Sequence, residues 1–136
     1  MSARRILIAD DNHDHVVLTL DALGPTIVDD AEVRVARDGR EALALLFDER
    51  WVPDLLLLDI QMPLADGFEV LEQLKEDEHL RSVPIVMLTS SADERDRCRS
   101  LGLGSERFVT KPVGAAALRE LVSQILSRSS RVEVNP

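Results

Sequence analysis

Apolar and polar positions along this chain divide it into two kinds of segment. Short continuous apolar runs occur at residues 6–9, 55–58 and 85–88, and weaker alternating runs occur at 33–36 and around 108–109. Between these runs, apolar residues recur at helical spacing, which predicts amphipathic helices. The helix anchors are Val16, Leu20 and Leu23; Leu43, Leu46 and Phe47; Phe68, Leu71 and Leu74; and Leu118, Leu121, Val122 and Ile125. Strands that alternate with helices in this way predict an α/β fold, a parallel sheet covered on both faces.

The character of each run also predicts its place in the sheet. Central parallel strands are buried on both faces and are continuously apolar, whereas edge strands can alternate. The first, third and fourth runs are continuous, and the second and fifth alternate. The expected strand order is therefore 2-1-3-4-5, the flavodoxin-like arrangement, which places the ends of the first and third strands side by side.

Turn-forming and polar residues predict where the helices end. Gly24-Pro25 should end the first helix and leave a long loop at residues 25–31. The fourth helix, at residues 93–101, is short and polar, and we expect it to be the least stable. Its expected anchors are Leu101 and Cys98, which should lie beneath the helix as a small hydrophobic residue.

Composition and charge narrow the classes of function. The net charge of -9 argues against direct binding to nucleic acid, because a polyanion is bound by clustered Lys and Arg. No apolar run approaches the ~20 residues of a membrane span, so no membrane partner is expected. The single cysteine excludes an internal disulfide and fits a cytoplasmic location. We expect one domain over residues 1–127 and a flexible tail over 128–136.

Acidic residues gather where two predicted strands end, at the edge where open α/β sheets bind ligands. Asp10 and Asp11 follow the first strand, and Asp59 follows the third. Neighbouring carboxylates raise one another's pKa unless a cation intervenes, and Mg2+ prefers oxygen ligands. A divalent-cation site is thus predicted, with Asp59 as the first candidate nucleophile. Taken alone, Asp10-Asp11 would be explained better as a solvated turn or a helix cap.

Two further polar residues stand at predicted strand ends. Thr89 ends the fourth strand, and Lys111 follows the fifth. Each has an ordinary explanation alone, Thr89 as a turn or cap with Ser90 and Ser91, and Lys111 as a surface lysine. Together with the carboxylates they form a set that suits phosphate, because Lys supplies a point cation and Thr a hydroxyl donor. Their joint occurrence favours a functional site.

This ordered set of motifs resembles the response-regulator receiver domain of bacterial two-component signalling. The resemblance covers residues 4 to about 126, and the matching segments are residues 6–12, Asp59 with Met62-Pro63, Asp66-Gly67, Thr89-Ser90 and residues 108–112. It implies a (βα)5 flavodoxin-like fold. It also implies a phosphoacceptor signalling module, with at most self-catalysed phosphotransfer and autodephosphorylation, in place of an enzyme.

The resemblance further implies a role for each acidic residue. Asp59 would accept a phosphoryl group from a histidine on a partner kinase. Asp11, Asp59 and the backbone carbonyl of Gln61 would hold Mg2+, and Asp10 would assist, often through water. These roles follow from the family and not from the spacing of the residues.

By the same resemblance, Thr89 and Lys111 would bind the remaining phosphoryl oxygens. Thr89 would then move towards the phosphoryl group and Phe108 would change rotamer, which alters the face built from the fourth helix, fifth strand and fifth helix. Phe108 stands where tyrosine is commonest, so this switch would work by packing without a hydroxyl. The Lys111-Pro112 peptide bond is expected to be cis.

Donor and target are both expected to be other proteins, because this length leaves no room for an ATP site or an output domain. The segments 25–31 and 71–91 resemble stand-alone regulators paired with phytochrome-type kinases. The mixed-charge run with Arg95, Arg97 and Arg99 is typical of a solvated face. A homodimer through the fourth helix, fifth strand and fifth helix is the alternative.

Two rival functions remain. Asp10-x-Asn12, Thr89 and Lys111 loosely follow the order found in haloacid-dehalogenase phosphatases, with Asp10 as the nucleophile, but Asp59 would then have no role. A receiver-like scaffold that never takes phosphate is disfavoured, because all the site residues are present. His13 and His15 lie two residues apart and do not face each other on a helix, so no metal role is expected for them.

Overall fold

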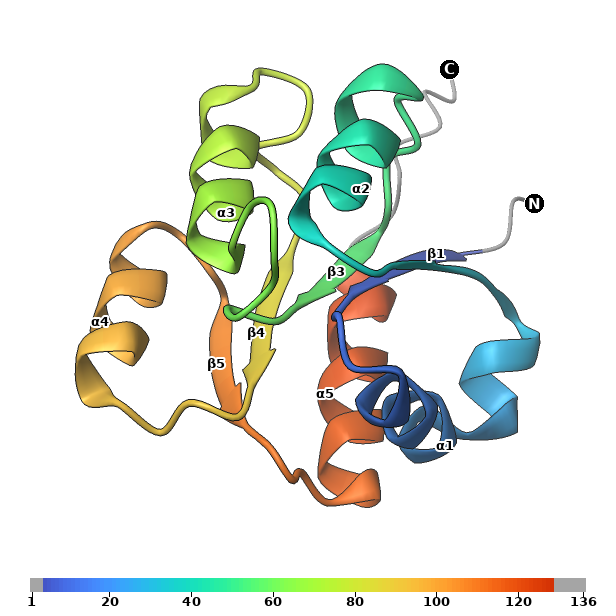
Figure 1. The fold of residues 1–136 in the computed structure, drawn as a ribbon. Helices are drawn as coiled ribbons and strands as arrows, with labels where there is room; N and C mark the ends of the chain where they lie inside the picture. The colour runs from blue at the N-terminus through green and yellow to red at the C-terminus, as the bar shows by residue number, and fades with distance from the viewer. Residues whose placement is uncertain (1–3, 129–136) are drawn as a thin grey trace.

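A single sheet organises the computed structural model, which describes residues 4–128. Within these residues, five parallel strands are paired in the order β2-β1-β3-β4-β5 (Figure 1). The strands are β1 (Arg4–Ala9), β2 (Ala31–Ala36), β3 (Leu55–Leu58), β4 (Ile85–Thr89) and β5 (Arg107–Thr110). The predicted flavodoxin-like order is therefore confirmed, with β2 and β5 at the edges.

Helices cover both faces of the sheet, so the structure has three layers (Figure 1). One face is covered by α1 (His13–Asp29) and α5 (Ala115–Arg128). The other face is covered by α2 (Gly39–Leu43), the π-helical turn η1 (Ala44–Asp48), α3 (Gly67–Glu76) and α4 (Glu94–Gly102). None of the helices in residues 4–128 is long and apolar enough to cross a membrane.

The central strands supply two separate cores because successive side chains point to opposite faces. In β3, Leu56 and Leu58 face the layer of α2 and α3, whereas Leu55 and Leu57 face α1 and α5. All four are almost fully buried, as expected for a continuous apolar run. This burial anchors the strand whose end carries Asp59.

The predicted loop at residues 25–31 is wrong. Gly24 does interrupt the first helix, with φ 80° and ψ 163°, but the chain resumes helical turns and α1 continues to Asp29. Pro25 is compatible with this restart, because a proline at the first position of a helix loses no hydrogen bond. Strand β2 then begins at Ala31, so this connection has almost no free loop.

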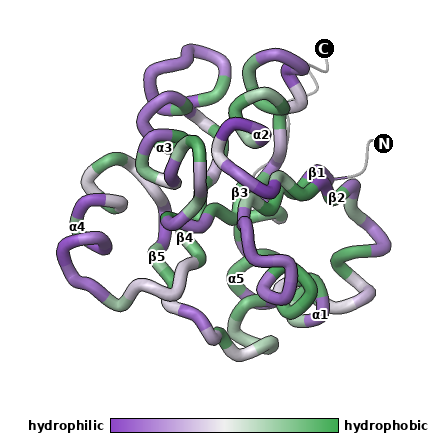
Figure 2. Tube along the Cα trace, in the orientation of Figure 1, coloured by the Kyte–Doolittle hydropathy of each residue, from purple (hydrophilic) through white to green (hydrophobic). Residues whose placement is uncertain are grey.

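The prediction for Cys98 is also wrong. Helix α4 forms where expected, but Cys98 is exposed and Leu101 is 39% exposed. The buried residue is Ser100, whose hydroxyl donates to the Asp96 carbonyl at 2.7 Å. Since most residues of α4 are hydrophilic (Figure 2) and its buried residue is Ser100, few apolar contacts hold it to the sheet.

A close backbone approach fixes the loop that carries Asp59. Asp66 caps the start of α3 by accepting from the Glu69 N–H at 3.0 Å, and the Gly67 N–H donates to the Ile60 carbonyl at 2.8 Å. A Cβ at Gly67 would lie 2.2 Å from the Asp59 carbonyl oxygen. Glycine is therefore required here by space, since the obstructing atoms are backbone.

Replacing Gly67 by alanine should destabilise the protein. The overpacking should lower the free energy of unfolding by about 2 kcal/mol, as measured by urea denaturation. Gly102→Ala is the matched control, because no atom lies within 4 Å of a Cβ at that position. We expect the control to change stability by less than about 1 kcal/mol. Equal effects of the two substitutions would contradict this account.

Candidate functional site

The strand order brings two buried carboxylates together. Asp10 follows β1 and Asp59 follows β3, and the two strands are neighbours in the sheet. The Asp59 N–H donates to the Ala9 carbonyl at 2.9 Å, and the Asp10 N–H donates to the Ala36 carbonyl at 3.0 Å. Asp10 is 4% exposed and Asp59 is 7% exposed. Both acids are thus held by the sheet itself at its carboxyl edge.

Lys111 brings a positive charge to these carboxylates from the far edge of the sheet. Its Nζ lies 2.5 Å from Asp10 Oδ2 and 3.4 Å from Asp59 Oδ2. The side chain is only 11% exposed, and its backbone N–H donates to the Thr89 carbonyl at 2.8 Å. The following Lys111-Pro112 bond is cis, as predicted. Lys111 is therefore a partly desolvated cation that two acids share.

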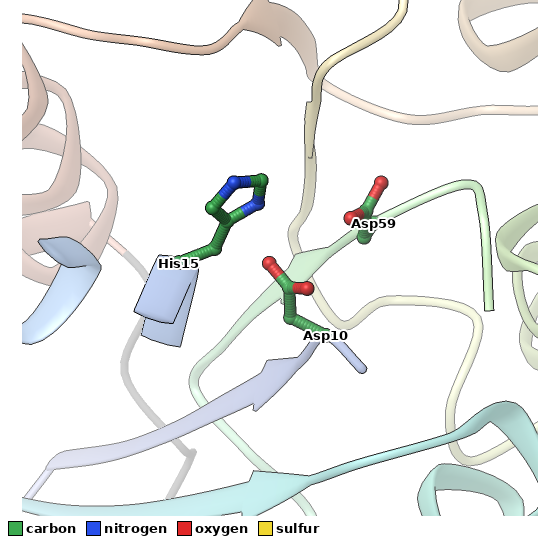
Figure 3. Close-up of side chains that lie close together, drawn as sticks. All are labelled: Asp10, His15 and Asp59. Carbon is green, nitrogen blue, oxygen red and sulfur yellow. The ribbon is translucent and has the colours of Figure 1, made fainter. Parts of the chain in front are cut away.

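His15 also belongs to this cluster, which sequence reasoning missed. It lies in the first turn of α1, and its Nδ1 is 3.1 Å from Lys111 Nζ. Figure 3 shows its ring beside the two carboxylates, which come from the ends of β1 and β3. The available signal was its position, because the first turn of a helix after a strand returns to the same edge of the sheet.

The remaining predicted residues lie nearby but differ in burial. Thr89 ends β4 and is 1% exposed, and its hydroxyl oxygen accepts from the Ser91 N–H at 3.3 Å. Phe108 is half-buried in β5 and pairs in register with Met87 of β4. Asp11 is exposed at the edge of the site. The expected convergence therefore holds for Asp10 with Asp59, and Asp11 is the outlying acid.

The donor atoms present suit a divalent cation. Among the described residues, one ligand atom each from Asp10, Asp59 and His15 lies within 4.8 Å of the others. The Gln61 N–H donates to Asp59 Oδ1 at 3.4 Å, so the loop after β3 folds back towards the carboxylate. Mg2+ prefers oxygen ligands such as carboxylates and carbonyls, and it keeps several water molecules when it is bound. The oxygen set therefore fits Mg2+.

A cavity opens beside the cluster, between α1 and α5. It has a volume of about 470 Å³ and is lined by His15, Leu18, Leu88, Lys111 and Pro112, among others. Leu18 is 64% exposed at its rim. The site thus combines two buried carboxylates, the ammonium group of Lys111 and a neighbouring cavity that is partly lined by apolar residues.

Comparison with protein families identifies the class. The model of the response regulator receiver domain matches residues 6–123. PleD of Caulobacter vibrioides, a response regulator, is 41% identical over 113 residues, which are 83% of this chain and 24% of PleD. The chain therefore belongs to the response regulator receiver domain family, whose members are signalling modules, and the predicted resemblance is confirmed. Several curated relatives are longer, and the chain spans 24% to 50% of their length.

Three solved structures are similar over almost the whole chain. The bacteriophytochrome response regulator AtBRR is 40% identical, covers 100% of both chains and has a TM-score of 0.78. The phosphorylated cyanobacterial phytochrome response regulator RcpA is 32% identical, covers 94% of both and has a TM-score of 0.79. The Mn2+-bound form of Rcp1 is 30% identical, covers 98% of this chain and 99% of the other, and has a TM-score of 0.77. The predicted resemblance to phytochrome-associated regulators is confirmed as a structural similarity.

Removal of the Lys111 charge should destabilise the protein. Lys111→Met leaves two buried carboxylates without their cation, which should lower the free energy of unfolding by about 3 kcal/mol in metal-free buffer. Added Mg2+ should restore part of this loss. The matched control is Lys75→Met, because the hydrogen-bond partner of Lys75 within residues 4–128 is the Arg81 carbonyl at the surface, and not an acid. It should cost less than about 1 kcal/mol and should not respond to Mg2+. An unchanged stability of Lys111→Met would contradict the view that Lys111 offsets the charge of the two buried carboxylates.

Proposed function

We propose that this chain accepts a phosphoryl group on Asp59 from a phosphorylated histidine of a partner kinase. The observation that carries the proposal is a buried Asp59 carboxylate at the end of the central strand β3, with the Lys111 Nζ 3.4 Å away. A buried nucleophile beside a fixed cation is the arrangement that phosphoryl transfer requires. The chain then acts as a switch that other proteins read.

The reaction depends on positioning and charge more than on nucleophilic strength, because a carboxylate is a weak nucleophile. An Asp59 oxygen attacks phosphorus, and the P–N bond to the donor imidazole breaks with its electron pair passing to nitrogen. Lys111 neutralises charge on the phosphoryl oxygens from the β5 side. Thr89 is at the end of β4, where its hydroxyl can donate to another phosphoryl oxygen.

Mg2+ is the proposed cofactor. Asp11, Asp59 and the Gln61 carbonyl would hold it, and Asp10 would contribute through water. When bound, it offsets the negative charge of the acids and of the phosphoryl oxygens. Two observations support a divalent cation: the oxygen donors gathered at the sheet edge and the Mn2+-bound form of the similar protein Rcp1.

The partner histidine is proposed to approach over α1. Leu18 lines the cavity beside Lys111 on this side, and both Leu18 and the preceding Val17 are exposed on α1. Exposed apolar side chains near a charged centre are typical of a surface that a partner covers. The similarity to AtBRR and RcpA supports a phytochrome-type kinase as the donor and a stand-alone regulator in the cytoplasm.

The output is proposed to be a changed surface formed by α4, β5 and α5. Thr89 and Phe108 would couple the site to this surface, because Phe108 lies in β5 next to β4, which ends in Thr89. Helix α4 has few buried residues, and elements with few apolar contacts are the ones that move at low cost. The altered surface would bind a downstream protein or a second copy of this chain.

Phosphorylation should require Asp59 and no other acid as acceptor. Incubation of the wild type with Mg2+ and a small acyl phosphate should add one phosphoryl group to the intact mass, and Asp59→Asn should show none. The control is Asp14→Asn, since Asp14 is an exposed acid in the first turn of α1. It should be phosphorylated as the wild type is.

The same experiment separates the rival functions. An adduct that survives Asp59→Asn and disappears in Asp10→Asn, together with turnover of phosphoesters, would favour a phosphatase. A wild type that takes no phosphoryl group, even in rapidly quenched samples, would favour a scaffold. Either outcome would overturn the proposed phosphoacceptor function.

A further inference from the structure

We infer that His15 is a positioning residue that holds Lys111 over the two carboxylates. The inference rests on the proposed role of Asp59 as phosphoryl acceptor. The contact itself is part of the structure, with His15 Nδ1 3.1 Å from Lys111 Nζ. Nothing in the family motifs that pointed to the site includes a histidine at this position.

The hydrogen-bonding capacity of Lys111 supports this role. A lysine ammonium has three N–H donors and no acceptor. Lys111 Nζ has three acceptors within reach, Asp10 Oδ2 at 2.5 Å, His15 Nδ1 at 3.1 Å and Asp59 Oδ2 at 3.4 Å. His15 therefore accepts the one Lys111 N–H that neither carboxylate accepts. Because Lys111 can only donate, His15 must accept through Nδ1 and carry its proton on Nε2.

The charge already present at the site favours an uncharged third acceptor. The site already contains two buried carboxylates, and a third acid at position 15 would add repulsion. An apolar residue would leave one ammonium N–H without a partner in a place that is 11% exposed, which is costly. A neutral imidazole satisfies the donor without adding negative charge. Histidine at position 15 thus provides the uncharged acceptor that the third N–H of Lys111 needs.

His15 is itself held in place. Its backbone N–H donates at 3.1 Å to the side chain of Asn12, the N-cap of α1. Lys111 is anchored separately through its backbone N–H to Thr89. The ammonium group is thus hydrogen-bonded to α1 on one side and to the acids at the strand ends on the other. Without His15, the shorter contact with Asp10 would dominate, and Lys111 would be drawn away from Asp59.

The expected consequence is a slower phosphorylation when His15 cannot accept. The initial rate with a small acyl phosphate and Mg2+ should fall about tenfold in His15→Leu. His15→Asn should recover most of the rate, because its side-chain oxygen is an acceptor near the Nδ1 position. His13→Leu is the matched control, since His13 is exposed and two residues away, and its rate should be unchanged.

Lys111→Met supplies the test of mechanism. If His15 acts only through Lys111, His15→Leu should cause no further loss of rate in the Lys111→Met background. A loss of equal size in both backgrounds would overturn the inference, as would an unchanged rate in His15→Leu. Urea denaturation of each variant checks that the fold persists.

A spectroscopic measurement tests the contact without phosphorylation. In 15N NMR spectra, His15 Nδ1 should be unprotonated, and its resonance should shift in Lys111→Met whereas that of His13 should not. A proton on His15 Nδ1, or no shift in Lys111→Met, would overturn the inference. This measurement needs no phosphoryl transfer. If the proposed function fails, the wild type will show no phosphorylation, but the NMR result for His15 will still stand.

Discussion

The proposed functional site of this protein is built on the contact between one ammonium group and two buried carboxylates. Asp10 and Asp59 come from neighbouring central strands, and Lys111 comes from the end of the edge strand. Removing such acids from water is costly unless a cation offsets them. Two carboxylates carry more negative charge than one ammonium group offsets, and this excess is the physical reason for proposing a divalent cation at the site. The strand order is what makes the contact possible.

The two faces of the sheet are held with different strength, and this difference fits their proposed uses. On one face, α1 and α5 contact each other and bury Val16, Leu23 and Leu118 against the strands. On the other, α4 buries only Ser100 among its own residues and is largely hydrophilic in Figure 2. A rigid face beside the site suits the docking of a donor, whereas a loosely held helix suits a surface that changes.

Much of this architecture could be predicted because it depends on strong local patterns. The continuous run Leu55–Leu58 allowed the central strand to be identified, and the alternation in β2 and β5 placed them at the edges. Asp10, Asp59 and Lys111 could be placed together because strand order and strand ends determine their positions. The family resemblance then supplied roles that spacing alone does not define.

The parts that could not be predicted depend on backbone geometry or on three-dimensional neighbours. The helical turn after Gly24 was missed because Gly-Pro ends most helices, and only the structure shows the chain restarting. Cys98 was expected to be buried from its chemistry, but the rotation of α4 turns Ser100 inwards instead. His15 was overlooked because its partner, Lys111, is 96 residues away in the sequence.

Chemical trapping of the acyl phosphate shows which side chain carries the phosphoryl group, Asp59 or another acid. Borohydride reduces an aspartyl phosphate to homoserine, which peptide mass spectrometry can locate in the chain. After treatment with an acyl phosphate and Mg2+, we expect homoserine at position 59 alone. Homoserine at position 10 or 11, with position 59 unmodified, would contradict it.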